Sequence, residues 1–184
     1  MTAAACHEFE PRSPALTWLL ARDIARREGL WCEFGVGDGA SLRQLVANRG
    51  NARVVGFDWF YGLPEDWRPG FAKGDFSRMG IAPDVPGAEI VVGLFADTLP
   101  SFNDRGQTLN LLHVDCDLYS STATALRWAR PLLADGSVIV FDELRGYPGW
   151  EKHEWRALQD EIERGLRVEL VCGNPQQVVY RVRA

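Results

Sequence analysis

The chain has 184 residues, of which 46% are hydrophobic and 24% are charged, and its formal net charge is -5. These values are typical of a soluble globular protein, and they exclude a disordered tail and a spanning helix, because no apolar run approaches the ~20 residues that a membrane span needs. The acidic balance argues against nucleic acid as a main partner, since phosphate binding requires a basic face. The chain start lacks the basic and apolar regions of a signal peptide, so we expect a cytoplasmic protein.

We expect one domain over residues 1–184, with disorder over 1–12. Ser13 followed by Pro14 is typical of a helix start, because serine caps the free amide groups and proline suits the first helical turn. Apolar residues then recur at helical spacing until Gly29. The pattern predicts a first helix over 15–27.

Short apolar segments separated by helical patterns make up most of the remaining chain. Near-continuous apolar runs favour strands that are buried on both faces, and their alternation with helices indicates a mostly parallel sheet. The predicted strands are 30–34, 53–57, 89–92, 109–114 and 137–141. The predicted helices are 41–48, 122–133 and 150–164. Two further strands, 167–172 and 177–182, are separated by the turn signal Gly-Asn-Pro, which predicts a closing antiparallel hairpin.

A glycine-rich loop, EFGVGDGAS, joins the first predicted strand to a helix. Its glycines, Gly35, Gly37 and Gly39, allow the backbone to approach a ligand at a helix N-terminus. The loop also fits the dinucleotide fingerprint, with Asp58 at the end of the next strand as the acid that binds a ribose. A glycine-rich turn without a ligand is the structural alternative.

The carboxylate of Glu33, directly before the loop, distinguishes between the candidate cofactors. A pyrophosphate is anionic and gains nothing from a neighbouring carboxylate, whereas S-adenosylmethionine (SAM) carries a cationic ammonium and a cationic sulfonium. Glu33 therefore favours SAM over NAD. The alternative is that Glu33 caps a helix or forms a salt bridge.

Five motifs occur in the order typical of one known family. They are the E-x-G-x-G-x-G loop, GFDWFYGLPEDW, LFADTLPSF, HVDCDLYSSTATAL and GSVIVFDE. On these motifs, which span residues 31–143, the chain resembles class I SAM-dependent methyltransferases, and among them the macrocin O-methyltransferase-like group. The resemblance implies a three-layer α/β sandwich of the Rossmann-like type. Its seven-stranded sheet would have the order 3-2-1-4-5-7-6, with strand 7 antiparallel.

The resemblance also implies how the cofactor is held. Glu33 and Gly35 would face the methionine part of SAM, and Asp58 would bind the ribose hydroxyls, unless it only caps the next turn. Trp59 and the segment 94–97 would lie near the adenine. The predicted cofactor-binding residues are Glu33, Gly35, Gly37, Gly39, Asp58, Trp59, Phe95, Asp97 and Asp115.

The sequence departs from its relatives in an aromatic cluster around Trp59, Tyr61 and Trp67, where relatives often carry small or acidic residues at two positions. An indole beside the adenine or the sulfonium would add affinity through stacking or a cation–π contact. Alternatively, the cluster belongs to the core or to an oligomer contact.

Four acids follow two neighbouring central strands: Asp115 and Asp117 after one, Asp142 and Glu143 after the other. Like charges at one sheet edge are costly unless a cation or a shared proton neutralises them, and oxygen ligands suit Mg²⁺. Carried over from metal-dependent relatives, the ligands would be Asp115, Asp142 and Glu143. Glu143 is longer than the usual residue, and the alternative is that Asp142 and Glu143 cap the next segment without a metal.

A general base is also expected near this edge. His153 and Glu154 begin the helix after the fifth strand, and histidine has a suitable pKa for the task, although a surface histidine without a role is the alternative. We predict His153, Asp117 and Glu154 as catalytic residues and His113 as structural.

The sequence therefore predicts methyl transfer from SAM to a hydroxyl of a small-molecule acceptor of the sugar or natural-product type, assisted by Mg²⁺. The first alternative is an NAD-dependent oxidoreductase. The second is a SAM-binding scaffold without catalysis. At this length the catalytic core has few additional walls, so we expect an open site or a homo-oligomer that completes it.

Overall fold

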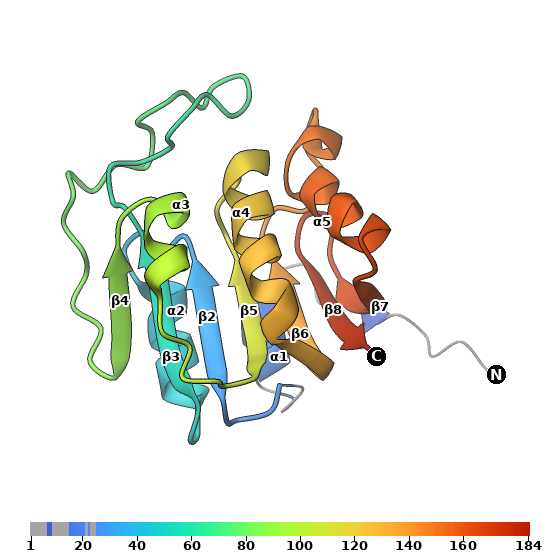
Figure 1. Ribbon diagram of the computed structural model, residues 1–184. Coiled ribbons are helices and arrows are strands. Elements are labelled where there is room, and N and C mark those ends of the chain that lie inside the picture. Colours follow the sequence, from blue (N-terminus) through green and yellow to red (C-terminus); the bar gives the residue numbers. More distant parts are fainter. Residues whose placement is uncertain (1–6, 9–14, 21, 23–24) are drawn as a thin grey trace.

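The computed structural model describes residues 7–8, 15–20, 22 and 25–184. One sheet forms its centre, and helices cover both faces (Figure 1). The strands are β1 (His7–Glu8), β2 (Leu30–Phe34), β3 (Arg53–Asp58), β4 (Ala88–Val92), β5 (Leu109–Val114), β6 (Leu133–Phe141), β7 (Arg167–Gly173) and β8 (Val178–Arg183). The α-helices are α1 (Ala15–Leu20), α2 (Ala40–Asn48), α3 (Phe95–Thr98), α4 (Tyr119–Ala129) and α5 (Glu154–Glu163). Three short 3₁₀ helices are η1 (Leu99–Ser101), η2 (Arg130–Leu132) and η3 (Trp150–Lys152).

The strand order is β1-β7-β8-β6-β5-β2-β3-β4. Strand β8 pairs antiparallel with β6 and β7, and the other pairs are parallel. Without β1, this is the predicted seven-stranded order with its antiparallel last strand, which is confirmed. The edge strand β1 was not predicted, because it falls in the stretch 1–12 for which we expected disorder; the other residues of that stretch lie outside the described residues.

The two faces of the sheet are buried by different helices, as Figure 1 shows. Helices α1 and α2 contribute Leu16, Leu19, Leu42 and Leu45 to one apolar layer, which also contains Trp31 of β2. On the other face, α4 and α5 pack on a second layer that contains the neighbouring residue of β2, Cys32. Successive strand side chains point to opposite faces, so a continuous apolar strand such as β2 fills both layers.

Three predicted helices differ from the observed ones at their ends. The first is observed over Ala15–Leu20 rather than 15–27, and its predicted cap at 13–14 lies outside the described residues. Helix α4 begins at Tyr119, earlier than expected, and Pro131 stands where the chain tightens into η2. The segment 150–164 is divided into η3 and α5, because His153 has a non-helical backbone. In the described part of the chain, none of the helices has the length and apolar character to cross a membrane.

The segment 59–87 connects β3 to β4 without a regular helix or strand, and it extends beyond the carboxyl ends of the strands (Figure 1). Backbone hydrogen bonds fold it on itself: Leu63 N–H donates to the Asp75 carbonyl at 2.9 Å, and Trp67 N–H donates to the Phe71 carbonyl at 3.1 Å. This segment therefore forms a wall at the edge of the sheet where ligands bind in open α/β folds.

Candidate functional site

An open cavity of about 900 Å³ lies at the carboxyl ends of the central strands. Its lining comes from the loop between β2 and α2, the end of β3, the segment 59–87, the start of α3, and the chain that follows β5 and β6. Six of the described lining residues are acidic, and one, Arg68, is basic. The cavity is therefore suited to a cationic ligand.

The three predicted glycines have different tasks in the loop. A Cβ atom on Gly35 would lie 1.8 Å from the Asp115 carbonyl oxygen, so only glycine allows the loop to approach the end of β5. Gly37 has φ +53°, and its missing Cβ would meet no atom within 4 Å, because it faces the open cavity. Gly39, with φ +82°, precedes α2 and packs against Val85. Gly35 and Gly37 line the cavity, whereas Gly39 does not.

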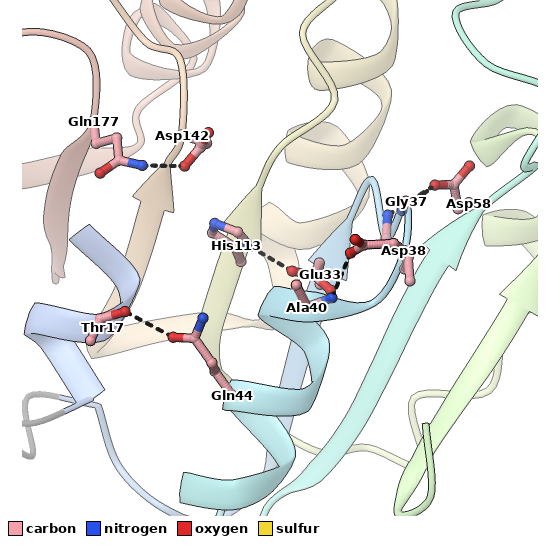
Figure 2. A network of polar contacts seen from close by, with 11 residues as sticks. Thr17, Glu33, Gly37, Asp38, Ala40, Gln44, Asp58, His113, Asp142 and Gln177 are labelled. Atoms are coloured by element: carbon pink, nitrogen blue, oxygen red, sulfur yellow. Dashed lines mark hydrogen bonds and ion pairs between the residues drawn. The ribbon is translucent and has the colours of Figure 1, made fainter. Parts of the chain in front are cut away.

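Asp58 lines the cavity and also holds the glycine loop. Its Oδ2 accepts hydrogen bonds from the N–H groups of Val36 and Gly37 at 2.9 and 3.0 Å (Figure 2). Its Oδ1 accepts from Phe60 N–H at 2.8 Å, so the capping alternative is also correct. A carboxylate has about four acceptor positions. The three contacts therefore leave about one position for a ribose hydroxyl, and ribose binding stays a prediction.

Glu33 does not reach the cavity, which corrects the prediction that it faces the methionine part of SAM. Its side chain is buried on β2, and its Oε1 lies 2.8 Å from His113 Nδ1 on β5 (Figure 2). Burial alone would lower the pKa of His113, but the hydrogen bond and charge of Glu33 raise it to about 9. The two side chains therefore form a buried ion pair at neutral pH. The salt-bridge alternative for Glu33 is the observed one.

Trp59 and Phe95, which were predicted to lie near the adenine, both line the cavity. The indole Nε1–H of Trp59 donates to the Gly62 carbonyl, which fixes the ring. Phe95 packs its edge on Phe34 with the ring centroids 5.0 Å apart. Asp97 is exposed and does not line the cavity, so the geometry gives no support to its predicted contact with the cofactor.

The four strand-end acids do come together in the cavity lining. Burial and the nearby charge of Asp142 raise the pKa of Asp115 well above its ordinary value. Burial, Glu143 and Asp142 raise the pKa of Asp117 to about 7, although the positive charge of Arg68 opposes this shift. Burial also raises the pKa of Glu143, again against Arg68. Asp117 has φ +61°, a backbone region that is rare for residues other than glycine and is often found at functional sites.

The predicted magnesium ligands do not fit a metal site. Gln177 Nε2–H donates to Asp142 Oδ1, as Figure 2 shows. Glu143 Oε2 lies 3.5 Å from Arg68 Nη2. Over the described ranges, no three His, Cys, Asp or Glu side chains converge as a metal centre requires. Two of the three predicted ligands also have protein partners, because one oxygen of Asp142 accepts from Gln177 and Glu143 faces the positive charge of Arg68.

Two of the three predicted catalytic residues lie outside the cavity lining. His153 stands beside the Trp67 ring, with centroids 6.2 Å apart, and burial and neighbouring cations lower its pKa. Glu154 is fully buried at the start of α5, where burial and neighbouring carboxylates raise its pKa well above the ordinary value. Asp117 is the predicted catalytic residue that faces the cavity.

Arg68 and Gln177 are residues of the site that the sequence did not reveal. The guanidinium carbon of Arg68 lies 4.1, 4.4 and 4.5 Å from the ring centroids of Trp67, Phe71 and Tyr147. Arg68 directly follows Trp67 in the GLPEDW motif, but only the course of the segment 59–87 brings it to the acids. Gln177 comes from the turn before β8, far from the motifs in sequence.

Comparisons with known proteins agree with this geometry. A family model described as "Methyltransferase domain" matches residues 32–144, more than half of the chain. The calicheamicin methyltransferase CalS11 is 25% identical, with a TM-score of 0.70, and the match covers 88% of this chain and 75% of that one. Its apo structure, described as a TDP-rhamnose 3'-O-methyltransferase, is 26% identical, with a TM-score of 0.63 and the same coverage.

A more distant structure shares the fold alone. An O-methyltransferase from Bacillus cereus in complex with S-adenosylhomocysteine (SAH) is 18% identical, with a TM-score of 0.55, and the match covers 98% of this chain and 84% of that one. No curated protein matches the sequence. The family match decides between the two predicted enzyme classes in favour of the methyltransferase over the oxidoreductase. With its glycine loop, strand order and strand-end acids, the chain belongs to the class I SAM-dependent methyltransferases.

Proposed function

We propose that the protein transfers the methyl group of SAM to a hydroxyl oxygen of a small molecule of the sugar or natural-product type. The observation that carries this proposal is the carboxylate of Asp117, which lies in the same cavity as the glycine loop and has a pKa near neutrality. The similarity to CalS11, a TDP-rhamnose 3'-O-methyltransferase, supports the acceptor class.

The cavity fits SAM in charge and in shape. Six acidic lining residues suit a ligand with a cationic ammonium and a cationic sulfonium. The space above Gly37 is open, so a ligand can lie directly on the backbone of the loop. The volume of about 900 Å³ is near the upper end of the range for small-molecule sites, which is roughly 300–1,000 Å³. It supports binding of an acceptor beside the cofactor.

The residues that would hold SAM are Gly35 and Gly37 of the loop, Asp58 at the end of β3, and the aromatic side chains of Trp59 and Phe95. SAM supplies a methyl group that is already activated by its positive sulfur. The tasks left to the protein are to position the acceptor and to remove its proton.

Asp117 would act as the general base. A base works best when its pKa lies near the working pH, because it is then ionised in a useful fraction and still binds a proton well. The pKa of Asp117, about 7, meets this condition. Its carboxylate would accept the proton of the acceptor hydroxyl, which leaves an oxygen able to attack the methyl group.

The segment 59–87 would form the acceptor wall. Trp67, Phe71 and Phe76 of this segment line the cavity. Aromatic faces are suited to the apolar faces of sugar rings and of natural products, and they reduce the access of water. This mechanism includes no Mg²⁺, because no three candidate ligand side chains converge among the described residues and Arg68 already places a positive charge beside Glu143.

A turnover assay tests the proposal. The protein would be incubated with SAM and a panel of nucleotide sugars, free glycosides and phenols, and SAH formation would be measured. We expect acceptor-dependent SAH formation, reduced about 10²-fold or more in Asp117→Asn and unchanged in Asp97→Asn, the matched control outside the cavity. SAM binding without turnover on any acceptor would instead support the scaffold alternative.

A further inference from the structure

Arg68, which belongs to the segment 59–87, is the one basic residue among the described residues that line the acidic cavity. The Arg68 side chain is 19% exposed, and its guanidinium stacks on three rings, those of Trp67, Phe71 and Tyr147. Each cation–π contact is attractive, and the attraction is strongest where water is excluded. The three rings therefore restrict the position of the Arg68 guanidinium.

The positive charge of Arg68 faces Glu143, the residue that is longer here than in metal-dependent relatives. Glu143 Oε2 is buried and has no hydrogen-bond partner among the described residues, and Arg68 Nη2, at 3.5 Å, is the cation beside it. Glutamate is one methylene longer than aspartate, so its carboxylate extends farther from the strand end. A buried carboxylate without a hydrogen bond needs a compensating charge, and Arg68 supplies one.

The neighbouring acid is also held by a protein group. Asp142 accepts a hydrogen bond from Gln177. Gln177 occupies one of the two Asp142 oxygens, and a divalent ion at this edge would share Glu143 with Arg68, at the cost of placing two cations close together. The donor set thus disfavours the metal that metal-assisted relatives use.

We propose that Arg68 is a positioning residue that serves as the built-in counter-cation of the acid cluster and takes the electrostatic role of a divalent metal. The catalytic part of this inference rests on the proposed function. The expected effect of Arg68 on metal binding does not. Its removal should leave Glu143, and with it the acid cluster, without this positive charge, so that the cluster gains affinity for a divalent cation.

Magnesium titrations test the proposal without an acceptor. In the wild type, isothermal titration with MgCl₂ should give no saturable heat, and Mg²⁺ should not change the melting temperature. In Arg68→Gln, Mg²⁺ should bind saturably and raise the melting temperature by about 2–4 °C, the shift that a modest gain in stability causes in a chain of this size. SAM binding, measured in the same samples, reports separately on the proposed function.

Three variants serve as controls. Arg78→Gln removes an exposed arginine from the same segment and should behave as the wild type. Arg68→Lys keeps a positive charge and should remain indifferent to Mg²⁺, whereas Arg68→Gln combined with Glu143→Gln should lose the acquired Mg²⁺ response. If Arg68→Gln does not fold, Arg68→Met, which keeps the apolar length of the side chain beside the rings, replaces it in the same titration. Stoichiometric Mg²⁺ binding by the wild type, or an Arg68→Gln protein that ignores Mg²⁺, would overturn the proposal.

Discussion

The ion pair of Glu33 and His113 joins β2 to β5 beneath the glycine loop, and both side chains are buried. Removing one partner of a buried pair leaves an uncompensated charge, which typically costs about 3–5 kcal/mol. We expect this loss of unfolding free energy for His113→Leu in urea denaturation. The double variant with Glu33→Leu should be much less destabilised, because both charges are removed. Equal stability of the single variant and the wild type would contradict the ion pair.

The same pair predicts a pH dependence of stability. The pKa of His113 is about 9 in the folded protein and about 6.5 in an unfolded chain. The folded state therefore holds this proton more tightly, so the contribution of the pair is complete below pH 6.5 and is lost as the pH rises through 9. The difference in unfolding free energy between the wild type and His113→Leu should be largest near pH 6 and smaller at pH 9.5. A constant difference would show that the proton is not involved.

Asp117 predicts the pH dependence of activity. Since the base must be ionised, methyl transfer should increase with pH, with its midpoint near 7. Glu143 raises the pKa of Asp117 and Arg68 lowers it. The midpoint should therefore move to lower pH in Glu143→Gln and to higher pH in Arg68→Gln. Rate profiles from pH 5.5 to 9 measure these shifts, and two variants with the wild-type midpoint would exclude Asp117 as the base.

At the scale of the elements, the glycine loop depends on the close approach between Gly35 and the end of β5. A methyl group there would meet the Asp115 carbonyl at 1.8 Å, whereas at Gly37 it would enter open space. Gly35→Ala should therefore lower the melting temperature much more than Gly37→Ala, which should mainly weaken SAM binding by filling the cavity. Thermal unfolding and SAM titration of both variants measure the two effects. Equal melting temperatures for Gly35→Ala and Gly37→Ala would contradict the structural role of Gly35 in the approach of the loop to β5.

The elements also explain which predictions from the sequence were confirmed. Strands buried on both faces leave an uninterrupted apolar run, so β2 and β5 have the predicted bounds. Glu33 was assigned wrongly because its partner His113 is 80 residues away and becomes its neighbour only through the β2–β5 register. The helix starting at 150 was interrupted at His153 by a backbone change that side-chain periodicity does not reveal.

At the scale of the whole molecule, the segment 59–87 is the part that the sequence described least. It carries aromatic residues but no helical or strand periodicity, so neither its course over the sheet nor the arrival of Arg68 at the acids was predictable. The segment also exposes Tyr61, Phe76, Met79 and Ile81, with Met79 77% exposed. The cavity is open, and the homo-oligomer stays a prediction that light scattering of the purified protein can test.

The central claim is that the cavity at the carboxyl edge of the sheet binds SAM. Isothermal titration of the wild type, Asp58→Ala and Asp97→Ala with SAM tests it most directly. Asp58 lines the cavity and holds Val36 and Gly37 by two hydrogen bonds, whereas Asp97 lies outside the lining. We predict one SAM per chain for the wild type and for Asp97→Ala, and an affinity at least about tenfold lower for Asp58→Ala, the effect of about 1.4 kcal/mol. No binding by the wild type at millimolar SAM, or wild-type affinity in Asp58→Ala, would contradict the claim.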